Sequence, residues 1–330
     1  LFPYTTLFDL TVALRFDIDA LSIDEAQVSH RPFSEGFSSK NKGMMHACGH
    51  DGHIAIGLML AKTLASQRDR LIGKIIFIFQ PAEEGVRGAK SMVDSGVLED
   101  ADYIFSGHIG FCKNKQVVCG VGGFLATSKL DVSFIGKAAH AGAYPELGKN
   151  ALLASANCAL NLHTLTQFSG GMSRLNVGVL RSGTARNVVP DHAHLELETR
   201  GETQEINEDL LQSVYRMIEG SAHMYDVAYE TKLMGSSPSY QYISSKFSRH
   251  VKNILDKLDL EIIEGGCLGG SEDITYMLQA VEKKGGHALY LLFGTKLTAP
   301  HHNPRFDFDE TVLLQGYNCY TKIVTDLLKN

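Results

Sequence analysis

Four short apolar runs constrain the fold of this 330-residue chain more than any other feature. They are Thr11–Ile18, Ile75–Gln80, Tyr103–Ser106 and Ala288–Phe293. Continuous apolar runs of this length, each followed by a polar turn with glycine, are typical of strands buried on both faces of a parallel sheet. Helical patterns lie between them, at Gly52–Ser66, Glu84–Ser95 and Phe308–Leu328. The alternation of strand and helix predicts an α/β layer architecture.

The middle of the chain has a different pattern. Four segments alternate apolar and polar residues, which is typical of strands with one solvated face. They are Lys129–Gly136, Arg174–Arg181, His192–Thr199 and Val227–Met234. With helical patterns at Asn150–Leu165 and Glu205–Met224, the predicted order is β-α-β-β-α-β, the ferredoxin-like arrangement. We therefore predict an α+β domain at residues 124–234, inserted into an α/β domain of residues 1–123 and 235–330.

Glycine-rich segments mark both boundaries of the predicted insertion. Gly120–Gly123 (GVGG) precedes it and Gly235–Pro238 (GSSP) follows it. Such segments are typical of turns and hinges. We predict that closure at these two hinges gates the active site.

Composition and charge exclude several classes of function. The chain has 37 acidic and 31 basic residues, and its formal net charge is −6. Nucleic acids and anionic membranes both require a basic patch, so neither is expected as a partner. No apolar stretch approaches the roughly 20 residues of a membrane span. The 6 cysteines are scattered without a CxxC pair, which argues against a disulfide framework and fits a reducing, cytoplasmic setting.

Residues of the types that bind metal ions gather at four places. These are His46, Cys48, His50, Asp51 and His53 in MHACGHDGH, Glu83 and Glu84 in QPAEEG, His108 in SGHIG, and His301 and His302 in PHHNPRFDF. Three of the groups follow predicted strands, and the carboxyl ends of strands form the ligand crevice of an open α/β sheet. The first group instead precedes the predicted helix at Gly52, which is also a plausible wall of the site.

Such a set of side chains suits two divalent metal ions. One cysteine, several histidines and two carboxylates match borderline metals such as zinc and manganese. In the Glu83-Glu84 pair, one carboxylate can bind metal while the other stays free to deprotonate the attacking water. Each group alone also has a structural explanation, since a histidine can cap a helix, Cys48 can be a small buried apolar residue and the glutamates can begin a helix. The prediction therefore depends on the four groups occurring together.

The motifs together resemble a known family. They are Asp17–Leu21 (DIDAL), Met45–His53, Gln80–Gly85, Gly136–Ala141 (GKAAHA), Arg186–Asp191 (RNVVPD), Gly270–Asp273 (GSED) and His302–Asp307 (HNPRFD). This set resembles the co-catalytic metallopeptidase clan of aminoacylases and carboxypeptidases, in particular its amidohydrolases acting on N-acyl amino acids. The resemblance covers the chain from about residue 11 to its end. It implies a mixed-sheet, zinc-peptidase-like catalytic domain with an inserted ferredoxin-like lid and dimerisation domain.

Further segments narrow this resemblance. They are Val28–Phe37, Gly43–His53, Met92–Gly96 and His301–Glu310. They resemble members that cleave p-aminobenzoyl-glutamate, a folate breakdown product, to p-aminobenzoate and glutamate, and that pair two related subunits. The resemblance implies a small-molecule N-acyl amino acid substrate and two divalent metal ions, with manganese expected and zinc as the alternative. It also implies either a homodimer or a heterodimer formed with a related subunit. The alternative is a broader hydrolase of hippurate or similar N-acyl amino acids.

The resemblance also implies a role for each matching residue. The implied metal ligands are Cys48, His50, Glu84, His108 and His302, with the Cys48 thiolate as a candidate bridge between two ions. Glu83 would be the general base. His140 would reach the active site of a neighbouring subunit and polarise the scissile carbonyl, while Arg186 and Asn187 would hold the substrate carboxylate. Taken alone, His140 could equally cap or pack, and Arg186-Asn187 could form the turn before Pro190.

Several other residues have two interpretations. Asp17 and Asp19 either support ligating histidines or form a turn. Glu272 and Asp273 either line the site or cap a helix that begins after them. Two histidines are expected to be structural, namely His46 and His53. His302, which lies two residues before Pro304, matches the last ligand of the family better than His301 does.

The first residues depart from the family. Members carry a longer segment before the DIDAL strand, and Leu1–Phe8 (LFPYTTLF) does not match it. We therefore expect a fragment, or a leader joined to a truncated reading frame, with a loss of buried apolar area that could rival the net stability. Two other functions stay open: a thiol amidase in which His50 activates Cys48, and a non-catalytic subunit that binds an active paralogue.

Overall fold

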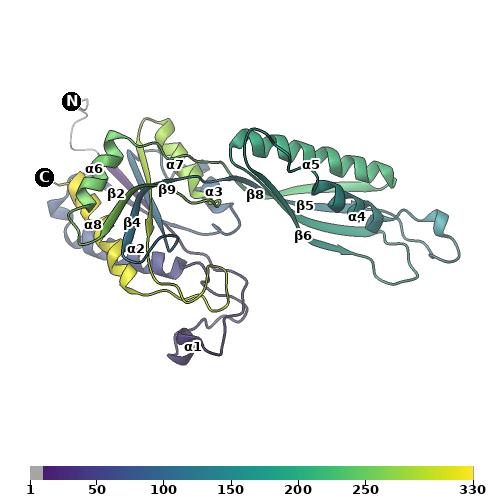
Figure 1. The fold of residues 1–330 in the computed structure, drawn as a ribbon, viewed down its shortest axis with the longest axis horizontal. Coiled ribbons are helices and arrows are strands. Elements are labelled where there is room, and N and C mark those ends of the chain that lie inside the picture. Colours follow the sequence, from purple (N-terminus) through teal and green to yellow (C-terminus); the bar gives the residue numbers. More distant parts are fainter. Residues whose placement is uncertain (1–9, 330) are drawn as a thin grey trace. The chain divides into compact units, whose positions relative to one another are not determined.

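The computed structural model describes residues 10–329, so the segment Leu1–Phe8 lies outside the described residues. The chain divides into two compact units (Figure 1). The first unit joins the part of the chain that ends at Gly123 to the part that begins at Gln241, and the second runs from Phe124 to Tyr240. The role of the second unit as a lid and dimerisation domain stays a prediction.

A mixed six-stranded sheet forms the centre of the first unit, in the order β2-β1-β3-β10-β4-β9. Its first four strands are parallel neighbours, namely β2 (Lys74–Gln80), β1 (Thr11–Asp17), β3 (Tyr103–Ile109) and β10 (His287–Phe293). All four correspond to the predicted apolar runs. β4 (Gln116–Gly122) pairs antiparallel with β10 and parallel with β9 (Glu261–Cys267), and neither of these two strands was predicted.

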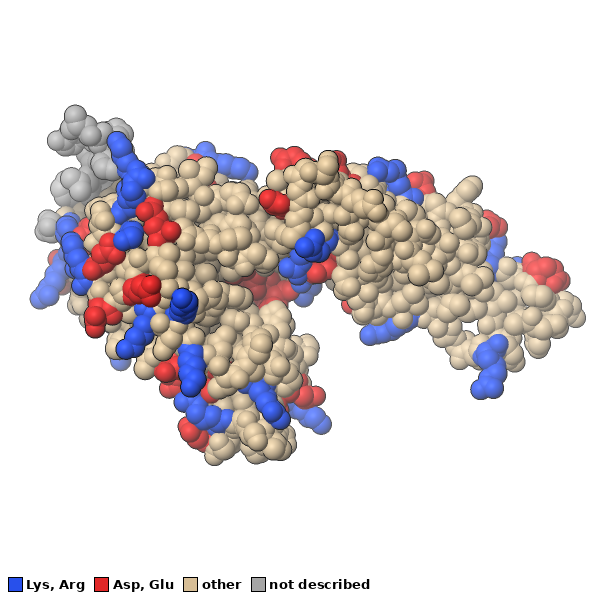
Figure 2. All heavy atoms as spheres, viewed as in Figure 1, with Lys and Arg blue, Asp and Glu red and all other residues tan. Residues whose placement is uncertain are grey.

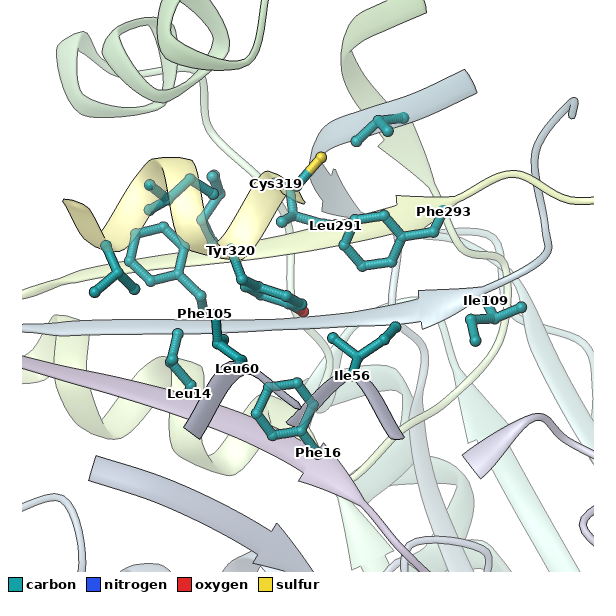
Figure 3. Packing of buried hydrophobic residues seen from close by; sticks show 14 of the residues in the cluster. Leu14, Phe16, Ile56, Leu60, Phe105, Ile109, Leu291, Phe293, Cys319 and Tyr320 are labelled. Atoms are coloured by element: carbon teal, nitrogen blue, oxygen red, sulfur yellow. The ribbon is translucent and has the colours of Figure 1, made fainter. Parts of the chain in front are cut away.

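Helices α2 (His50–Ser66) and α8 (Thr311–Leu327) pack on each other over one face of this sheet. Figure 3 shows their side chains meeting the strands, with Ile56 and Leu60 beside Phe16 and Tyr320. α6 (Lys246–Leu255) contacts α8 and adds to the same cluster. The other helices of the first unit are α3 (Gly88–Asp94) and α7 (Ile274–Lys283), which pack on each other, and two short ones, α1 (Arg31–Ser34) and η1 (Arg68–Arg70).

One local prediction for the first unit was wrong. The helix expected at Glu84–Ser95 begins only at Gly88, because Ala82 and Val86 have φ angles of +60° and +47° and hold the preceding residues in a turn. Gly120 and Gly122 lie within β4, and the first part of this unit ends at Gly123, so a hinge at this boundary stays a prediction.

The second unit is a four-stranded antiparallel sheet in the order β6-β7-β5-β8, covered by two helices. In chain order its elements are β5 (Ala126–Ile135), η2 (Pro145–Leu147), α4 (Ala151–Leu162), β6 (Ser173–Ser182), β7 (His192–Gly201), α5 (Gln204–Met224) and β8 (Ala228–Ser237). The side chains of Asn150 and Thr203 cap the two helices by accepting hydrogen bonds from backbone N–H groups. The observed order is the predicted β-α-β-β-α-β. β8 continues past Met234, so the expected hinge at Gly235–Pro238 lies largely inside a strand.

Charged side chains of both signs are interspersed on the face of each unit shown in Figure 2. This distribution agrees with the modest net charge of −6. Among residues 10–329, no helix has both the length and the apolar character needed to cross a bilayer.

Candidate metal centre

The candidate site lies at the carboxyl edge of the four parallel strands. Asp17 ends β1, Glu83 follows the end of β2, and His108 lies near the end of β3. His302 lies in the loop that follows β10. Because these strands are neighbours in the order β2-β1-β3-β10, their carboxyl ends bring these side chains to one place.

A tight turn before α2 positions Cys48 and His50. Gly49 between them has φ +87°, a left-handed conformation that glycine adopts without steric cost. The Cys48 side chain is buried, and its Sγ lies 3.4 Å from Nε2 of His108. Burial raises the pKa of the Cys48 thiol to about 12. The thiol can therefore donate its proton to His108 Nε2, and a metal cation would displace that proton.

His108 is held with Nε2 directed at Cys48. Its Nδ1 donates a hydrogen bond of 2.8 Å to the carbonyl oxygen of Ile109, so the lone pair of the neutral ring lies on Nε2. Burial and the neighbouring His53 lower the pKa of His108 well below its usual value. The neutral ring is the form that binds metal ions.

The strained turn after β2 and the loop after β10 bring Glu84 to His302. Nε2 of His302 lies 3.5 Å from Oε2 of Glu84. His302 has φ +63°, and its backbone N–H donates a hydrogen bond of 2.7 Å to the carbonyl of Ala47, one residue before Cys48. The neighbouring His301 points elsewhere, since its Nε2 donates to the carbonyl of Ile109 at 3.0 Å. Of the two histidines, His302 is thus the one placed among the ligand atoms.

The five predicted ligands form two sets that share one atom. Sγ of Cys48 belongs to a set with His50 and His108, and also to a set with Glu84 and His302. Within each set the ligand atoms lie within 4.8 Å of one another. A third set joins His50 and Glu84 to Glu83, the predicted general base.

The chemistry of these residues fits a cation. Nδ1 of His50 donates to the carbonyl of Asp19 at 3.0 Å, which leaves Nε2 buried and without a hydrogen-bond partner among residues 10–329. Burial alone would lower the pKa of His50, but the carboxylate of Asp17, with further contributions from Asp19 and Cys48, raises it to about 12. A positive charge is therefore strongly favoured at this position, and a metal ion bound at Nε2 would supply it.

His53 forms a further set of candidate ligands with Asp17 and His50, but its ring nitrogens already have hydrogen-bond partners. Its Nδ1 is hydrogen-bonded to Oδ1 of Asp17, and its Nε2 accepts the backbone N–H of Ile109 at 3.0 Å. Both ring nitrogens are therefore engaged, and His53 links β1 to β3. Asp19 supports the ligands in a similar way, since its Oδ2 accepts the backbone N–H of Glu84 at 3.0 Å.

A buried arginine, which sequence reasoning missed, lies behind the site. Arg15 is 1% exposed, and its Nη1 donates to Asp17 at 2.8 Å. Its Nη1 lies 3.7 Å from Glu272 and its Nη2 lies 3.5 Å from Asp273. Burial alone would raise the pKa of Asp17, but the Arg15 guanidinium holds it well below its usual value. The available sequence signal was a single cation within an otherwise apolar strand.

Glu272 and Asp273 precede α7 without capping it by a side-chain hydrogen bond. Instead Glu272 accepts a hydrogen bond of 2.5 Å from Tyr290, and Asp273 accepts from Gln80 at 2.7 Å and from the backbone of Ala89 at 2.9 Å. The two carboxylates thus belong to the buried network of Arg15.

The remaining predicted residues lie in the second unit, on two paired loops. The backbone N–H of Ala141 donates to the carbonyl of Asn187 at 3.0 Å. Nδ1 of His140 accepts the N–H groups of Gly142 and Ala143 at 3.1 and 3.0 Å, so Nε2 carries the proton. His140, Arg186 and Asn187 are all exposed at the surface of this unit.

Comparison with known proteins identifies the family. The model of peptidase family M20/M25/M40 matches residues 13–326, nearly the whole chain. The chain belongs to this family. It is accordingly a metal-dependent hydrolase of the amidohydrolase and metallopeptidase type.

Three relatives of this M20-family chain are similar over most of its length. One of the p-aminobenzoyl-glutamate hydrolase subunits from Escherichia coli is 51% identical over 92% of this chain and 70% of its own length. Its homolog from Haemophilus influenzae is 44% identical over 96% of this chain and 76% of its own length. Indole-3-acetyl-aspartic acid hydrolase from Enterobacter agglomerans is 49% identical over 92% of this chain and 70% of its own length.

Solved structures agree with the family fold. An aminobenzoyl-glutamate utilization protein from Klebsiella pneumoniae has a TM-score of 0.78 and 37% identity, covering 96% of this chain and 71% of its own. A dinuclear metal-binding M20 peptidase from Bacillus subtilis has a TM-score of 0.68 and 25% identity, and the match covers 97% of this chain and 82% of that peptidase. The mixed sheet and the separate antiparallel sheet are therefore the fold of this family.

Proposed function

We propose that this chain hydrolyses the amide bond of p-aminobenzoyl-glutamate to p-aminobenzoate and glutamate, with two divalent metal ions. The observation that carries the proposal is the pair of ligand sets that share Sγ of Cys48. A thiolate shared by two sets can bridge two ions, and the remaining ligands divide as two histidines on one side and Glu84 with His302 on the other. The similarity to the p-aminobenzoyl-glutamate hydrolase subunits of two bacteria supports the substrate.

Glu83 is the residue that we propose moves the proton. Burial, with the nearby carboxylates of Glu272 and Asp17, raises the pKa of Glu83 well above its usual value. A carboxylate of this kind can take the proton of the attacking water and later deliver it to the leaving nitrogen. When bound, the metal ions supply Lewis-acid polarisation of the scissile carbonyl.

The metal that we propose is manganese, with zinc as the alternative. The set contains one sulfur ligand, histidine nitrogens and a carboxylate oxygen. Thiolate favours zinc, whereas carboxylate and imidazole also accept manganese.

We further propose that the second unit contributes to catalysis in a dimer. His140, with its proton on Nε2, is suited to donate a hydrogen bond to the oxyanion formed in the active site of the dimer partner. The exposed Arg186 guanidinium and the adjacent Asn187 are suited to bind the carboxylate of the released amino acid. The partner is either a second copy of this chain or a related subunit, since the relatives are themselves named as subunits.

A second candidate substrate is an indole-3-acetyl-aspartate-type amide. It is supported by the 49% identity to a hydrolase of that compound. Both substrates join an aromatic acyl group to an acidic amino acid. A broader range, including hippurate, is the remaining alternative.

The test begins with the metal content of the folded chain, reconstituted with manganese or zinc and measured by elemental analysis. We expect about two ions per chain. The loaded protein is then assayed on p-aminobenzoyl-glutamate, indole-3-acetyl-aspartate and hippurate, and we expect the highest kcat/KM on the first. A folded chain that binds no metal would instead support the non-catalytic role.

Treatment with a chelator separates this mechanism from a thiol amidase. The raised pKa of Cys48 disfavours the thiolate nucleophile that such an amidase needs. We expect a chelator to abolish hydrolysis and added manganese to restore it. A thiol amidase would keep its activity in the chelator.

A further inference from the structure

Phe111 is an exposed aromatic residue close to a proposed metal ligand. It follows β3 by two residues and lies three residues after His108. Its side chain is 52% exposed, although the seven residues before it, 104–110, are all buried. Its φ is +60°, a left-handed conformation that is a genuine outlier for a bulky residue.

One face of the Phe111 ring is covered and the ring is held in place. His301 stacks on it with ring centroids 4.2 Å apart and an interplanar angle of 2°. His301 is itself fixed by its hydrogen bond to Ile109 and by contact with the ring of Phe306 at 4.9 Å. Because the stacked face is occupied while half of the side chain is exposed, the opposite face is accessible to a ligand.

The Phe111 ring also contacts the metal centre. Its centroid lies 5.1 Å from that of His108 in an edge-to-face arrangement. His108 in turn lies 3.4 Å from Sγ of Cys48, the atom common to both ligand sets. Phe111 therefore packs directly against one proposed ligand, and a substrate whose amide carbonyl lies at this centre has the Phe111 ring beside it.

We propose that Phe111 is a specificity-determining residue that stacks on the aromatic ring of the substrate's acyl group. The inference rests on the proposed amide hydrolysis and deepens it, since it assigns a place to the aryl part of the substrate. A flat π-surface beside the scissile bond selects planar aromatic acyl groups over small aliphatic ones. This selection does not depend on whether the released amino acid is glutamate or aspartate.

Two features of Phe111 favour contact with a ligand beyond its packing on His301 and His108. Phe111 packs on one face only, and its side chain is 52% exposed. The left-handed backbone is also unfavourable for phenylalanine, and glycine would adopt it freely. Exposure and strain that persist together near a reactive centre are typical of a residue that contacts a ligand.

The experiment compares two substrates with the same amino acid and different acyl groups. The manganese-loaded chain is assayed on p-aminobenzoyl-glutamate and on N-acetyl-glutamate. We expect Phe111→Ala to lower the ratio of the two kcat/KM values about tenfold, the upper range for the loss of an aromatic pair. Phe111→Tyr retains the π-surface, and we expect it to keep the ratio.

Two further variants make the comparison decisive. Phe37 is another phenylalanine of the first unit, 49% exposed, and we expect Phe37→Ala to leave the ratio unchanged. Should Phe111→Ala fold poorly, Phe111→Gly serves instead, because glycine accepts φ +60° and also removes the ring. Elemental analysis establishes that each variant holds as much metal as the wild-type chain. A ratio that changes less than about twofold in metal-loaded Phe111→Ala or Phe111→Gly overturns the proposal.

A binding measurement separates this proposal from the proposed function. The chain has no tryptophan, so the fluorescence of p-aminobenzoate reports its binding directly. If the wild-type chain hydrolyses neither amide, the proposed function is wrong, and this titration alone decides the role of Phe111. Weakening of p-aminobenzoate binding by about tenfold in Phe111→Ala supports the aromatic platform, and unchanged binding refutes it.

Discussion

Replacement of Arg15 by methionine tests whether the buried charge network behind the candidate site stabilises the fold. Methionine has a similar length and removes only the guanidinium. In the structure that group contacts Asp17 at 2.8 Å and lies 3.7 Å from Glu272 and 3.5 Å from Asp273. Its Nε also donates to Oε1 of Gln80 at 2.8 Å. The substitution therefore leaves three carboxylates behind without their shared cation.

The expected cost follows from the loss of a buried cation. Removing one partner of a buried ion pair typically destabilises a protein by about 3–5 kcal/mol, because a buried charge is left uncompensated. Protonation of Glu272 relieves part of this cost, since burial raises the pKa of Glu272 to about 7. We therefore expect a loss of about 3 kcal/mol, the lower end of that range and still a large share of the roughly 5–15 kcal/mol that stabilises a typical domain.

The assay is urea denaturation of the metal-free chain followed by far-UV circular dichroism, which excludes any effect of metal affinity. The matched control is Arg31→Met, since Arg31 bonds to Asp307 at 3.0 Å with 41% of its side chain exposed. We expect that control to lose less than about 1 kcal/mol. Adding Glu272→Gln to Arg15→Met should recover part of the loss, because it removes one uncompensated carboxylate. A loss in Arg15→Met no larger than that of the control would refute the reasoning.

Three further predictions concern the site itself. Glu83→Gln should keep its metal but lower kcat by about 10²–10⁴-fold, and turnover near the wild-type rate would contradict its role as the base. Cys48→Ser should lower the content of both ions in elemental analysis, whereas Cys319→Ser, in the apolar core, should leave it unchanged. If His140 serves a partner's site, mixing inactive His140→Ala with inactive Glu83→Gln should restore activity at about a quarter of the sites of a homodimer. Absence of any recovery after verified exchange of subunits would argue against that arrangement.

The strands of the first unit that could be predicted are those with a strong local signal. All seven residues of β1 are buried, and the sequence shows this as an apolar run. β4 and β9 contain several glycines, and β9 also carries charged residues, so neither has the period of a half-buried strand or the continuity of a buried one. Their pairing with each other and with β10 is a tertiary interaction between distant segments. No window of sequence around either strand contains that information.

The candidate site also has a part that the local sequence predicts and a part that it does not. The residue types in MHACGHDGH and QPAEEG indicated a metal centre, because thiolate, imidazole and carboxylate are all metal-binding groups. The assignment of each role depended on the family resemblance, and the structure adds the geometry in which Cys48 is common to two ligand sets. Arg15 was missed because a cation within an apolar strand is locally unfavourable. Its stabilisation depends on Glu272 and Asp273, which lie more than 250 positions away in the sequence.

The unfavourable backbone conformations show where local preference yields to the site. Of the seven non-glycine residues with positive φ among those described, four surround the candidate centre, namely Ala82, Val86, Phe111 and His302. Each left-handed conformation costs about 1–2 kcal/mol for an L-residue, so the clustering of four requires compensation from elsewhere. The buried strands that these loops leave, together with backbone bonds such as His302 N–H to Ala47, supply it. Burial in the sheet thus offsets the cost of the strained loops at its carboxyl edge. Those loops direct Glu83, Glu84 and His302 toward one centre.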